Sequence, residues 1–210
     1  MAEYVLYCFA QLGNAYKAAL MLALSGADWE PRFVDYFNGE TRTPAYRAIN
    51  EMGEVPVLLH DGRTLTQSGA ILTYLAEQRG RFGPESEDER LEILRWLLFD
   101  NHKLTSYTAT LRFMRTFGNT GETPVTEFLE MRSQTALGIL EGHLGRAFVV
   151  NDRPTIADLS LCGYLYWPDE IGVVWEETHP NIAAWLGRIA ALDGWQHPYE
   201  LMPGHPLKGS

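Results

Sequence analysis

Short apolar runs separated by turn-forming residues fill the first eighty positions of the chain. Tyr4 to Phe9 is apolar and aromatic without helical spacing, which predicts a buried strand. Trp29 to Val34 predicts a second strand. Val57 to His60 and Arg63 to Leu65 are two extended runs separated by Asp61-Gly62, a dipeptide that favours a tight turn, so they predict a hairpin.

Helical patterns alternate with these strands. Asn14 is a candidate cap for a helix that runs to Leu24 and stops at Ser25-Gly26. Thr43-Pro44 predicts the start of a short helix, because proline suits the first helical position. Ser68 opens a third helix, whose apolar face is formed by Ile71, Leu72, Leu75 and Ala76. The order β-α-β-α-β-β-α, with a parallel first β-α-β, predicts a thioredoxin-like domain.

The pattern changes after residue 80. Gly80 to Asp88 is rich in glycine, proline and charge, which is typical of a linker. Helical spacing then follows over residues 91–116, 123–144, 155–167 and 181–191. We therefore expect an α/β thioredoxin-like domain over residues 1–80, a linker over 81–88 and an all-helical bundle over 89–210.

Composition narrows the classes of function. Of the 210 residues, 46% are apolar and 21% are charged, as in an ordinary globular protein. The formal net charge is −10 and basic residues do not cluster, so we expect no nucleic-acid binding. No apolar stretch approaches the roughly 20 residues of a membrane helix, and the acidic start has no signal-peptide pattern. With only Cys8 and Cys162, a cytoplasmic protein without a disulfide framework is expected.

Three motifs in a fixed order carry more specific information. Gly53-Glu54-Val55-Pro56-Val57 precedes the hairpin, Gln67-Ser68 opens the third helix, and Thr155-Ile156-Ala157-Asp158 lies in the helical half. With this order and spacing the chain resembles the cytosolic, bacterial-type glutathione S-transferase superfamily over nearly its whole length. The resemblance implies a thioredoxin-like domain followed by an all-helical domain, glutathione as co-substrate and no metal.

The resemblance also implies that the Val55–Pro56 bond is cis, a form that costs only about 0.5–1 kcal/mol before proline. The backbone of Val55 would then pair with the cysteinyl part of glutathione like an added strand. The alternative is an ordinary trans proline at a strand start.

Gln67 and Ser68 stand where the γ-glutamyl end of glutathione is expected. Its carboxylate suits the free N–H groups and positive dipole of a helix N-terminus, and Ser68 adds a hydroxyl donor. Gln67 offers an oxygen to the ligand's ammonium, although many relatives have an acid there. The alternative for Ser68 is a plain helix cap.

Two further contacts are implied by the family pattern. Arg42 is the candidate for the glycyl carboxylate, because its guanidinium donors form a fork; the alternative is surface solvation. Asp100 is the candidate that reaches the glutamyl ammonium of a neighbouring subunit; the alternative is a solvated helix residue. A homodimer is implied, with Tyr74, Gln78, Trp96 and Asp100 near its contact.

The group that ionises the glutathione thiol departs from the family pattern. Close bacterial relatives often read Ser-Gly-Asn-Ser-x-Lys here, but in this chain both serines are replaced, by Leu12 and Ala15. Gly13 and Asn14 remain, and the Asn14 amide can donate to sulfur; the alternative is that Asn14 only caps the helix. For Tyr7 we favour strand packing over catalysis, and for Cys8 a buried apolar role. Lys17 is expected to face solvent.

The other motifs have structural interpretations. Thr155 and Asp158 form the pattern of a capping box. The six histidines show no ligand spacing, so no metal is expected. The second substrate is expected between the domains. Its candidate walls, by helical spacing and family analogy, are Tyr107, Leu111, Met114 and Trp167, and the alternative for each is core packing.

Two hypotheses for function follow. The first is an enzyme that activates the glutathione thiol for attack on a small hydrophobic electrophile, or for reduction of a disulfide or peroxide. The second is a glutathione-binding scaffold with little or no turnover, which the two missing serines favour.

Overall fold

The computed structural model describes residues 2–207, and the chain divides into two compact units. One unit comprises Met1–Arg81 together with Leu192–Ser210, and the other comprises Phe82–Ala191. The sequence placed residues 89–210 in a single helical domain, so the last segment of the chain departs from that expectation.

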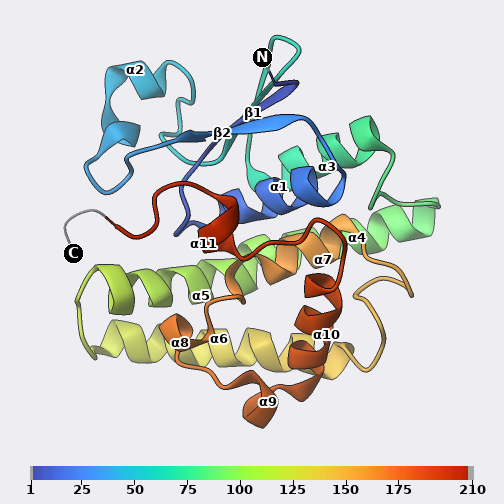
Figure 1. Cartoon of the computed structure of the whole chain (residues 1–210). Helices are drawn as coiled ribbons and strands as arrows, with labels where there is room; N and C mark the ends of the chain where they lie inside the picture. Colours follow the sequence, from blue (N-terminus) through green and yellow to red (C-terminus); the bar gives the residue numbers. More distant parts are fainter. Residues whose placement is uncertain (1, 208–210) are drawn as a thin grey trace. The chain divides into compact units, whose positions relative to one another are not determined.

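A four-stranded sheet forms the centre of the first unit (Figure 1). Its strands are β1 (Tyr4–Cys8), β2 (Trp29–Phe33), β3 (Val57–His60) and β4 (Arg63–Thr66), in the spatial order β2-β1-β3-β4. The β1–β2 pair is parallel, whereas β1–β3 and β3–β4 are antiparallel. The thioredoxin-like order and the hairpin predicted from the sequence are therefore confirmed.

Helices α1 (Gly13–Leu24) and α3 (Ser68–Arg79) pack beside each other on one side of this sheet (Figure 1). Ten of the twelve residues of α1 are buried, which explains why its sequence is apolar nearly all round. The short helices η1 (Glu40–Arg42) and α2 (Pro44–Arg47) connect β2 to β3. Thr43 caps α2 by accepting from the Tyr46 N–H, as the Thr-Pro pair predicted.

The C-terminal segment belongs to the first unit because it is bonded to β1 and α1. The Tyr16 hydroxyl donates to the carbonyl of Gln196 at 2.9 Å, and the Ala10 N–H donates to the carbonyl of Pro203 at 2.8 Å. Helix α11 (Pro198–Leu201) lies between these two bonds and packs on α1. Local periodicity in the sequence carried no signal for these distant partners.

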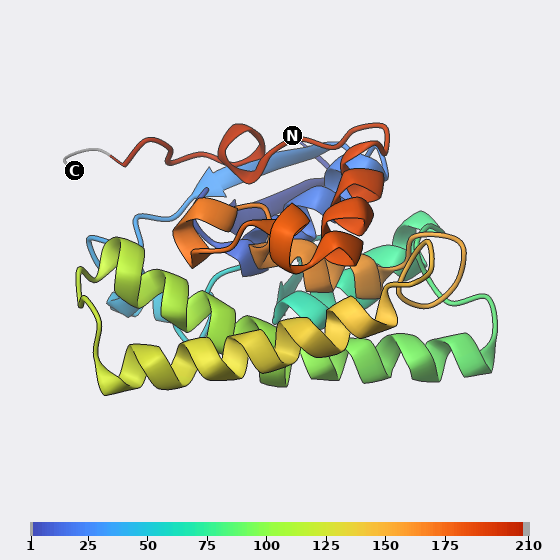
Figure 2. The same cartoon turned by 90° about the horizontal axis from the view of Figure 1, so that it is seen from below.

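The second unit is helical, and none of residues 82–191, all of which the structure describes, lies in a strand. Its first helices are α4 (Glu87–Phe99), η2 (Asp100–Leu104), α5 (Thr105–Arg112), η3 (Phe113–Phe117) and α6 (Pro124–His143). They are followed by α7 (Ile156–Leu161), η4 (Cys162–Tyr164), α8 (Pro168–Ile171), α9 (Trp175–Thr178) and α10 (Pro180–Ala190). Figure 2 shows α5 and α6 side by side, and the predicted all-helical character is confirmed.

Helix boundaries depart from the sequence predictions at three places. Helix α4 begins at Glu87, inside the expected linker. The Ser86 side chain caps it by accepting from the Glu89 N–H, and the three acidic residues of its first turn interact favourably with the positive end of the helix dipole. The helix expected over residues 91–116 is interrupted by two π-helical stretches, η2 and η3. The helix expected over residues 155–167 ends at Leu161, and α8, α9 and α11 were not predicted.

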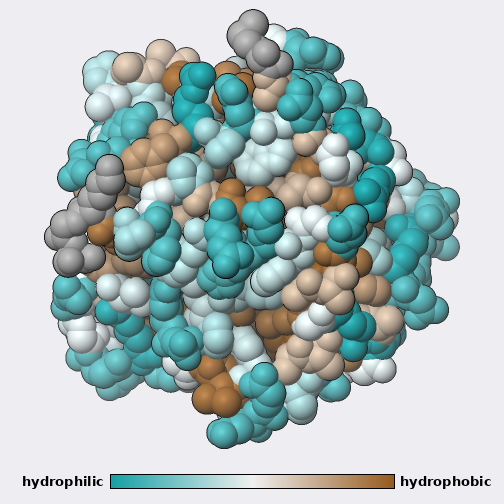
Figure 3. Space-filling model, in the orientation of Figure 1, coloured by the Kyte–Doolittle hydropathy of each residue, from teal (hydrophilic) through white to brown (hydrophobic). Residues whose placement is uncertain are grey.

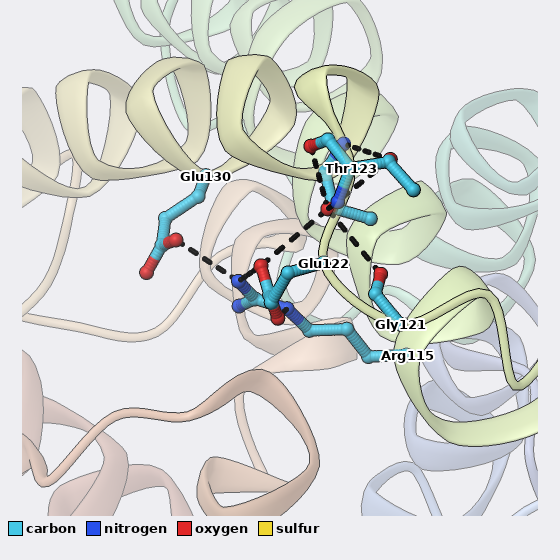
Figure 4. Close-up of polar contacts among 6 residues, drawn as sticks. Arg115, Gly121, Glu122, Thr123 and Glu130 are labelled. Atoms are coloured by element: carbon cyan, nitrogen blue, oxygen red, sulfur yellow. Dashed lines mark hydrogen bonds and ion pairs between the residues drawn. The ribbon is translucent and has the colours of Figure 1, made fainter.

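The start of α6 is fixed by polar contacts around Arg115 (Figure 4). The Arg115 guanidinium donates to both carboxylate oxygens of Glu122, at 3.0 and 2.9 Å, and to Glu130 at 2.9 Å. Thr123 and Thr126 form a reciprocal capping box at the helix start. These bonds hold the loop that connects η3 to α6.

Asp158 is the central polar group of the second unit, where it is fully buried. Its carboxylate accepts from the N–H of Val149 and of Thr155, from the Thr155 hydroxyl and from the Trp185 indole. The predicted capping box of Thr155 and Asp158 is therefore confirmed. Burial nevertheless raises the pKa of the Asp158 carboxyl above its ordinary value.

Candidate functional site

The loop before β3 presents the backbone of Val55. The Val55–Pro56 bond is cis, as the resemblance implied, and the alternative of a trans proline is wrong. Within residues 2–207 the Val55 N–H and C=O have no backbone hydrogen bond. The preceding carbonyl, that of Glu54, is fixed by the Tyr46 hydroxyl at 2.9 Å and the Asn50 amide at 2.8 Å. A fixed backbone segment with open donor and acceptor groups can pair with an extended peptide.

Gly53 is required in this loop for two reasons. Its φ is +66°, in the left-handed region that favours glycine. A Cβ at this position would also lie 3.0 Å from the carbonyl oxygen of Thr41 and 3.2 Å from the guanidinium of Arg47. The glycine of the sequence motif is thus explained by backbone conformation and by close packing together.

The N-terminus of α3 lies next to this loop, since Gln67 contacts Glu54 and Met52, and Ser68 is 9% exposed there. Gln67 is the N-cap residue, with φ 67° and ψ 116°, and its side chain does not cap the helix. Ser68 is the first helical residue, so the alternative that Ser68 is the cap is wrong. The first turn contains no acid, and a helix start with free N–H groups attracts an anion.

The N-terminus of α1 is built in the same way. Its N-cap residue is Leu12, which has no side chain able to cap, and no acid lies in its first turn. Asn14 therefore lies inside the helix, and the alternative that it caps α1 is wrong. Asn14 is half-buried, and its side-chain oxygen accepts a long hydrogen bond of 3.5 Å from the Ser68 hydroxyl. The first turns of α1 and α3 thus meet.

The other long helices have satisfied N-termini. Ser86 caps α4 and Thr123 caps α6. The Glu141 carboxylate accepts from the N–H groups of Asn181 and Ile182 in the first turn of α10. Among the described helices of ten or more residues, only α1 and α3 lack such a partner, and these are the two that converge at Asn14 and Ser68. Their free donors form a local positive region in an acidic chain.

The side chains near the end of β1 are engaged in packing. The Tyr7 hydroxyl accepts from the Arg32 guanidinium at 2.9 Å, and that guanidinium lies over the Tyr7 ring. Cys8 is fully buried, and burial raises the pKa of its thiol to about 12. Both observations agree with the structural roles we favoured. Lys17 is only 1% exposed, so the expectation that it faces solvent is wrong.

Gln67 contacts a residue that the sequence analysis did not consider. Its side-chain amide nitrogen donates to the Glu54 carboxylate at 2.8 Å and to the Met52 sulfur at 3.3 Å. Both Gln67 and Glu54 are exposed. Arg42 is also exposed, and its guanidinium lies against the backbone of Gly39.

Asp100 is not available to a neighbouring molecule. It is 1% exposed, and its carboxylate accepts hydrogen bonds from the hydroxyls of Thr105 and Ser160. This carboxylate stabilises the π-helical turn of η2, since Thr105 follows it by five residues. This burial disagrees with both expectations for Asp100, the contact with a neighbouring subunit and the solvated helix residue. Trp96, another residue expected near a subunit contact, is only 2% exposed.

The four candidate walls for a second substrate differ in exposure. Leu111 and Trp167 are nearly fully buried, and the Arg112 guanidinium lies 3.9 Å from the centre of a Trp167 ring, which agrees with core packing. Tyr107 and Met114 are partly exposed. The Arg132 guanidinium donates to the Tyr107 hydroxyl at 3.1 Å, and this bond lowers the pKa of that phenol.

A cavity of about 650 Å³ lies within the first unit. Its apolar walls include Phe9, Phe33 and Phe37, and the C-terminal segment from Gly204 to Leu207 closes one side. Gln11 also lines the cavity, and its amide donates to the carbonyl of Gly204 at 2.8 Å. Since Phe9 and Gln11 lead directly into α1, the cavity borders the same loop that positions Asn14. The sequence did not reveal it, because its walls are far apart along the chain.

No metal centre is evident among residues 2–207, where His, Cys, Asp and Glu side chains form no group of three suited to an ion. None of the described helices is both long and apolar enough to cross a membrane.

Comparison with protein families identifies both units. Residues 4–77 match the model of the glutathione S-transferase N-terminal domain, and residues 103–193 match that of the C-terminal domain. The chain belongs to the glutathione S-transferase family. The resemblance inferred from the Val-Pro, Gln-Ser and Thr-Ile-Ala-Asp motifs is therefore confirmed.

Individual relatives agree with this assignment. A maleylacetoacetate isomerase from Rhizobium meliloti is 31% identical over 96% of this chain and 99% of its own length. The crystal structure of a possible glutathione S-transferase from Rhodopseudomonas palustris has a TM-score of 0.86 at 34% identity, covering 93% of this chain and 89% of the other. A glutathione transferase from Phanerochaete chrysosporium, solved with oxidised glutathione, has a TM-score of 0.82 at 25% identity, covering 90% and 91%.

Proposed function

We propose that this glutathione S-transferase-like protein binds glutathione in the first unit, along the Val55 backbone and across the first turns of α3 and α1. The observation that carries the proposal is the convergence of two uncapped helix starts, marked by the 3.5 Å contact of Ser68 with Asn14. The γ-glutamyl carboxylate accepts from the Ser68 N–H and hydroxyl. The cysteinyl backbone pairs with Val55 beside Pro56, and Gln67 lies next to the glutamyl ammonium.

The thiol is then stabilised at the start of α1. A free thiol has a pKa of about 8.5, and lowering it by two units requires about 2.7 kcal/mol of preference for the thiolate. Gly13 and Asn14 offer first-turn N–H groups and the Asn14 amide, with no acid in that turn to oppose an anion. Tyr7 is 7% exposed and its oxygen accepts from Arg32, which favours strand packing, and the pKa of the Cys8 thiol is near 12, so we assign this stabilisation to Asn14 and the helix start.

Arg42 is the proposed partner of the glycyl carboxylate. It is exposed, and its guanidinium packs closely on Gly39, where a Cβ would lie only 2.7 Å from a guanidinium nitrogen. A guanidinium held near a loop by packing keeps donors free for a bidentate contact with a carboxylate.

The electrophile has two proposed locations. The first is in the second unit, where Tyr107 and Met114 are partly exposed and Leu111 and Trp167 are buried. The cavity offers the apolar walls of Phe9, Phe33 and Phe37 to the electrophile, and it borders the loop that leads to the proposed thiolate. We favour this second location because a defined cavity supports it.

The reaction is proposed to be thiolate attack on a small hydrophobic electrophile, or reduction of a disulfide or peroxide. Because one relative is a maleylacetoacetate isomerase, isomerisation is a third reaction to assay. Each needs the same ionised sulfur. The alternative is a glutathione-binding scaffold without useful turnover, supported by Leu12 and Ala15 at the positions of the family's serines.

A homodimer in the cytoplasm completes the proposal. Apolar side chains that lie about half exposed occur on α4 (Leu91, Leu94, Leu98) and on α6 (Val125, Phe128, Met131). Apolar side chains at this spacing on a helix favour contact with a second copy. The face drawn in Figure 3, which labels none of these residues, also has brown, hydrophobic areas among hydrophilic ones. Sedimentation would test the dimer.

Titration calorimetry with glutathione tests the binding proposal directly. We expect saturable binding that S-substituted glutathione competes for. Assays of conjugation, disulfide reduction and isomerisation then separate the enzyme from the scaffold. Absence of binding at millimolar glutathione would overturn the proposal.

A further inference from the structure

One part of the proposed glutathione site lacks an evident charge partner. The α-amino group of the γ-glutamyl residue is an ammonium with three donors, and charged hydrogen bonds of this kind are about twice as strong as neutral ones. Gln67, the residue next to this group, is neutral. The ammonium would therefore be left without an anion unless a neighbouring residue supplies one.

We propose that Glu54 supplies this negative charge and that Gln67 positions it. The inference rests on the proposed binding of glutathione. The Glu54 carboxylate is the acid in direct contact with Gln67, with 2.8 Å between its oxygen and the Gln67 amide nitrogen. Because a carboxylate only accepts, this bond fixes the amide nitrogen toward Glu54 and leaves the amide oxygen on the other side.

Both side chains project from anchored backbone. The Glu54 carbonyl accepts from the Tyr46 hydroxyl and the Asn50 amide, and Glu54 directly precedes Val55. Gln67 precedes the open start of α3, and its own carbonyl accepts from the Ile71 N–H. Glu54 and Gln67 therefore reach each other from two separate segments, the loop before β3 and the start of α3, which together form the proposed γ-glutamyl position.

The Glu54 carboxylate is available for a ligand. Within residues 2–207 it forms no ion pair, and it is exposed. The second carboxylate oxygen makes no hydrogen bond within that range, and the Gln67 amide oxygen makes none either. Together they offer two acceptors, one of them charged, beside the positive start of α3. This arrangement fits a zwitterionic α-amino acid group, with its carboxylate at Ser68 and its ammonium at Glu54.

The arrangement makes Glu54 a specificity residue for the free α-amino group. Wild-type protein should prefer glutathione to its deaminated analogue, glutaryl-cysteinyl-glycine, which keeps the carboxylate and the thiol. Removing the charge at Glu54 should reduce this preference, whereas restoring a charge at residue 67 should recover it.

The experiment measures dissociation constants of both ligands for four proteins: wild type, Glu54→Gln, Glu54→Gln with Gln67→Glu, and Glu51→Gln. We expect Glu54→Gln to lower the preference for glutathione by about tenfold or more, as for loss of a charge-assisted hydrogen bond. The double variant, Glu54→Gln with Gln67→Glu, should recover most of this preference for glutathione. Glu51→Gln, which removes an exposed acid three residues away, should retain it.

Three outcomes separate the possibilities. If Glu54→Gln leaves the ratio of the two dissociation constants unchanged, whether or not both affinities fall, the role of Glu54 is overturned. A loss of preference in Glu51→Gln as large as that in Glu54→Gln would show a general charge effect and would also overturn it. Failure of wild type to bind either ligand would instead overturn the proposed glutathione site. Unchanged thermal unfolding of Glu54→Gln would show that the variant is folded.

Discussion

The Ser68 hydroxyl lies 3.5 Å from the side-chain oxygen of Asn14, although 54 positions separate the two residues. This contact joins the first turns of α3 and α1, neither of which has a capping side chain. An anion placed between them would meet free N–H donors from two helices. The first two predictions test what each residue contributes.

Ser68→Ala should weaken glutathione binding with little effect on stability. The matched control is Ser86→Ala, which removes a true cap from α4 and should cost about 1 kcal/mol of unfolding free energy. We expect Ser68→Ala to raise the dissociation constant by about tenfold, through loss of a hydrogen bond to a charged group. Calorimetry and denaturant unfolding of both variants check this. The opposite pattern, with Ser68→Ala mainly destabilising the fold, would refute the ligand contact.

Asn14→Ala should raise the pKa of the bound glutathione thiol. Loss of one donor to the thiolate corresponds to a rise of about one unit, or about 1.4 kcal/mol. Thiolate absorbance in the ultraviolet, titrated against pH with saturating glutathione, measures it. The titration midpoint should move to higher pH, and the loss of thiolate absorbance should be greatest between the wild-type and the variant midpoints. Asn101→Ala, on the exposed surface of the second unit, is the control. A superimposable titration curve for Asn14→Ala would assign the sulfur contact elsewhere.

Cys8 should be inert in the folded protein. Its thiol is fully buried with a pKa of about 12, so roughly one thiol in ten thousand is ionised at pH 8. Alkylation should follow unfolding only, and Cys8→Ala should retain glutathione binding. Rapid labelling of the native thiol at neutral pH would contradict this burial.

The same shift of the Cys8 pKa predicts a pH dependence of stability. The folded pKa lies above the unfolded value of about 9, so the protonated thiol favours the folded state below pH 9. This contribution falls as pH rises from about 9 toward 12. Comparison of alkaline unfolding for wild type and Cys8→Ala isolates it, and the variant should lose less stability over that interval. Parallel curves would count against the shift.

Phe37→Ala should impair binding of an aromatic electrophile in the cavity of the first unit and leave glutathione affinity unchanged. Phe37 is a partly exposed wall of that cavity. Gly204→Val tests the C-terminal side, because φ is +98° there and a Cβ would lie 2.5 Å from the Phe33 ring. Both variants should raise the KM for the electrophile several-fold. Ile139→Ala, which truncates an exposed apolar side chain on α6, is the control. An unchanged KM in both variants would contradict binding in this cavity and would favour the other proposed location, at Tyr107 and Met114.

Much of this fold was evident in local sequence. The strands, the Asp61-Gly62 turn and the apolar face of α3 depend on alternation, turn residues and helical spacing, which neighbouring positions determine. The start of α4 was missed because Ser86 and the acidic residues after it look like a polar linker in the sequence, whereas in the structure they cap the helix and form its first turn. The π-helical turn at Asp100 was missed because its partners, Thr105 and Ser160, become neighbours only after folding.

The sequence by itself determined the family, the order of the elements and the residues that flank the proposed glutathione site, since short motifs such as Val55-Pro56 and Gln67-Ser68 encode local backbone conformation. Tertiary structure decided which of those residues are accessible and what they touch. It buried Asp100, brought Glu54 to Gln67 and placed the C-terminal segment on the first unit. The physical reason is that burial and hydrogen-bond partnership depend on segments far apart in the chain, and periodicity along the chain carries no record of them.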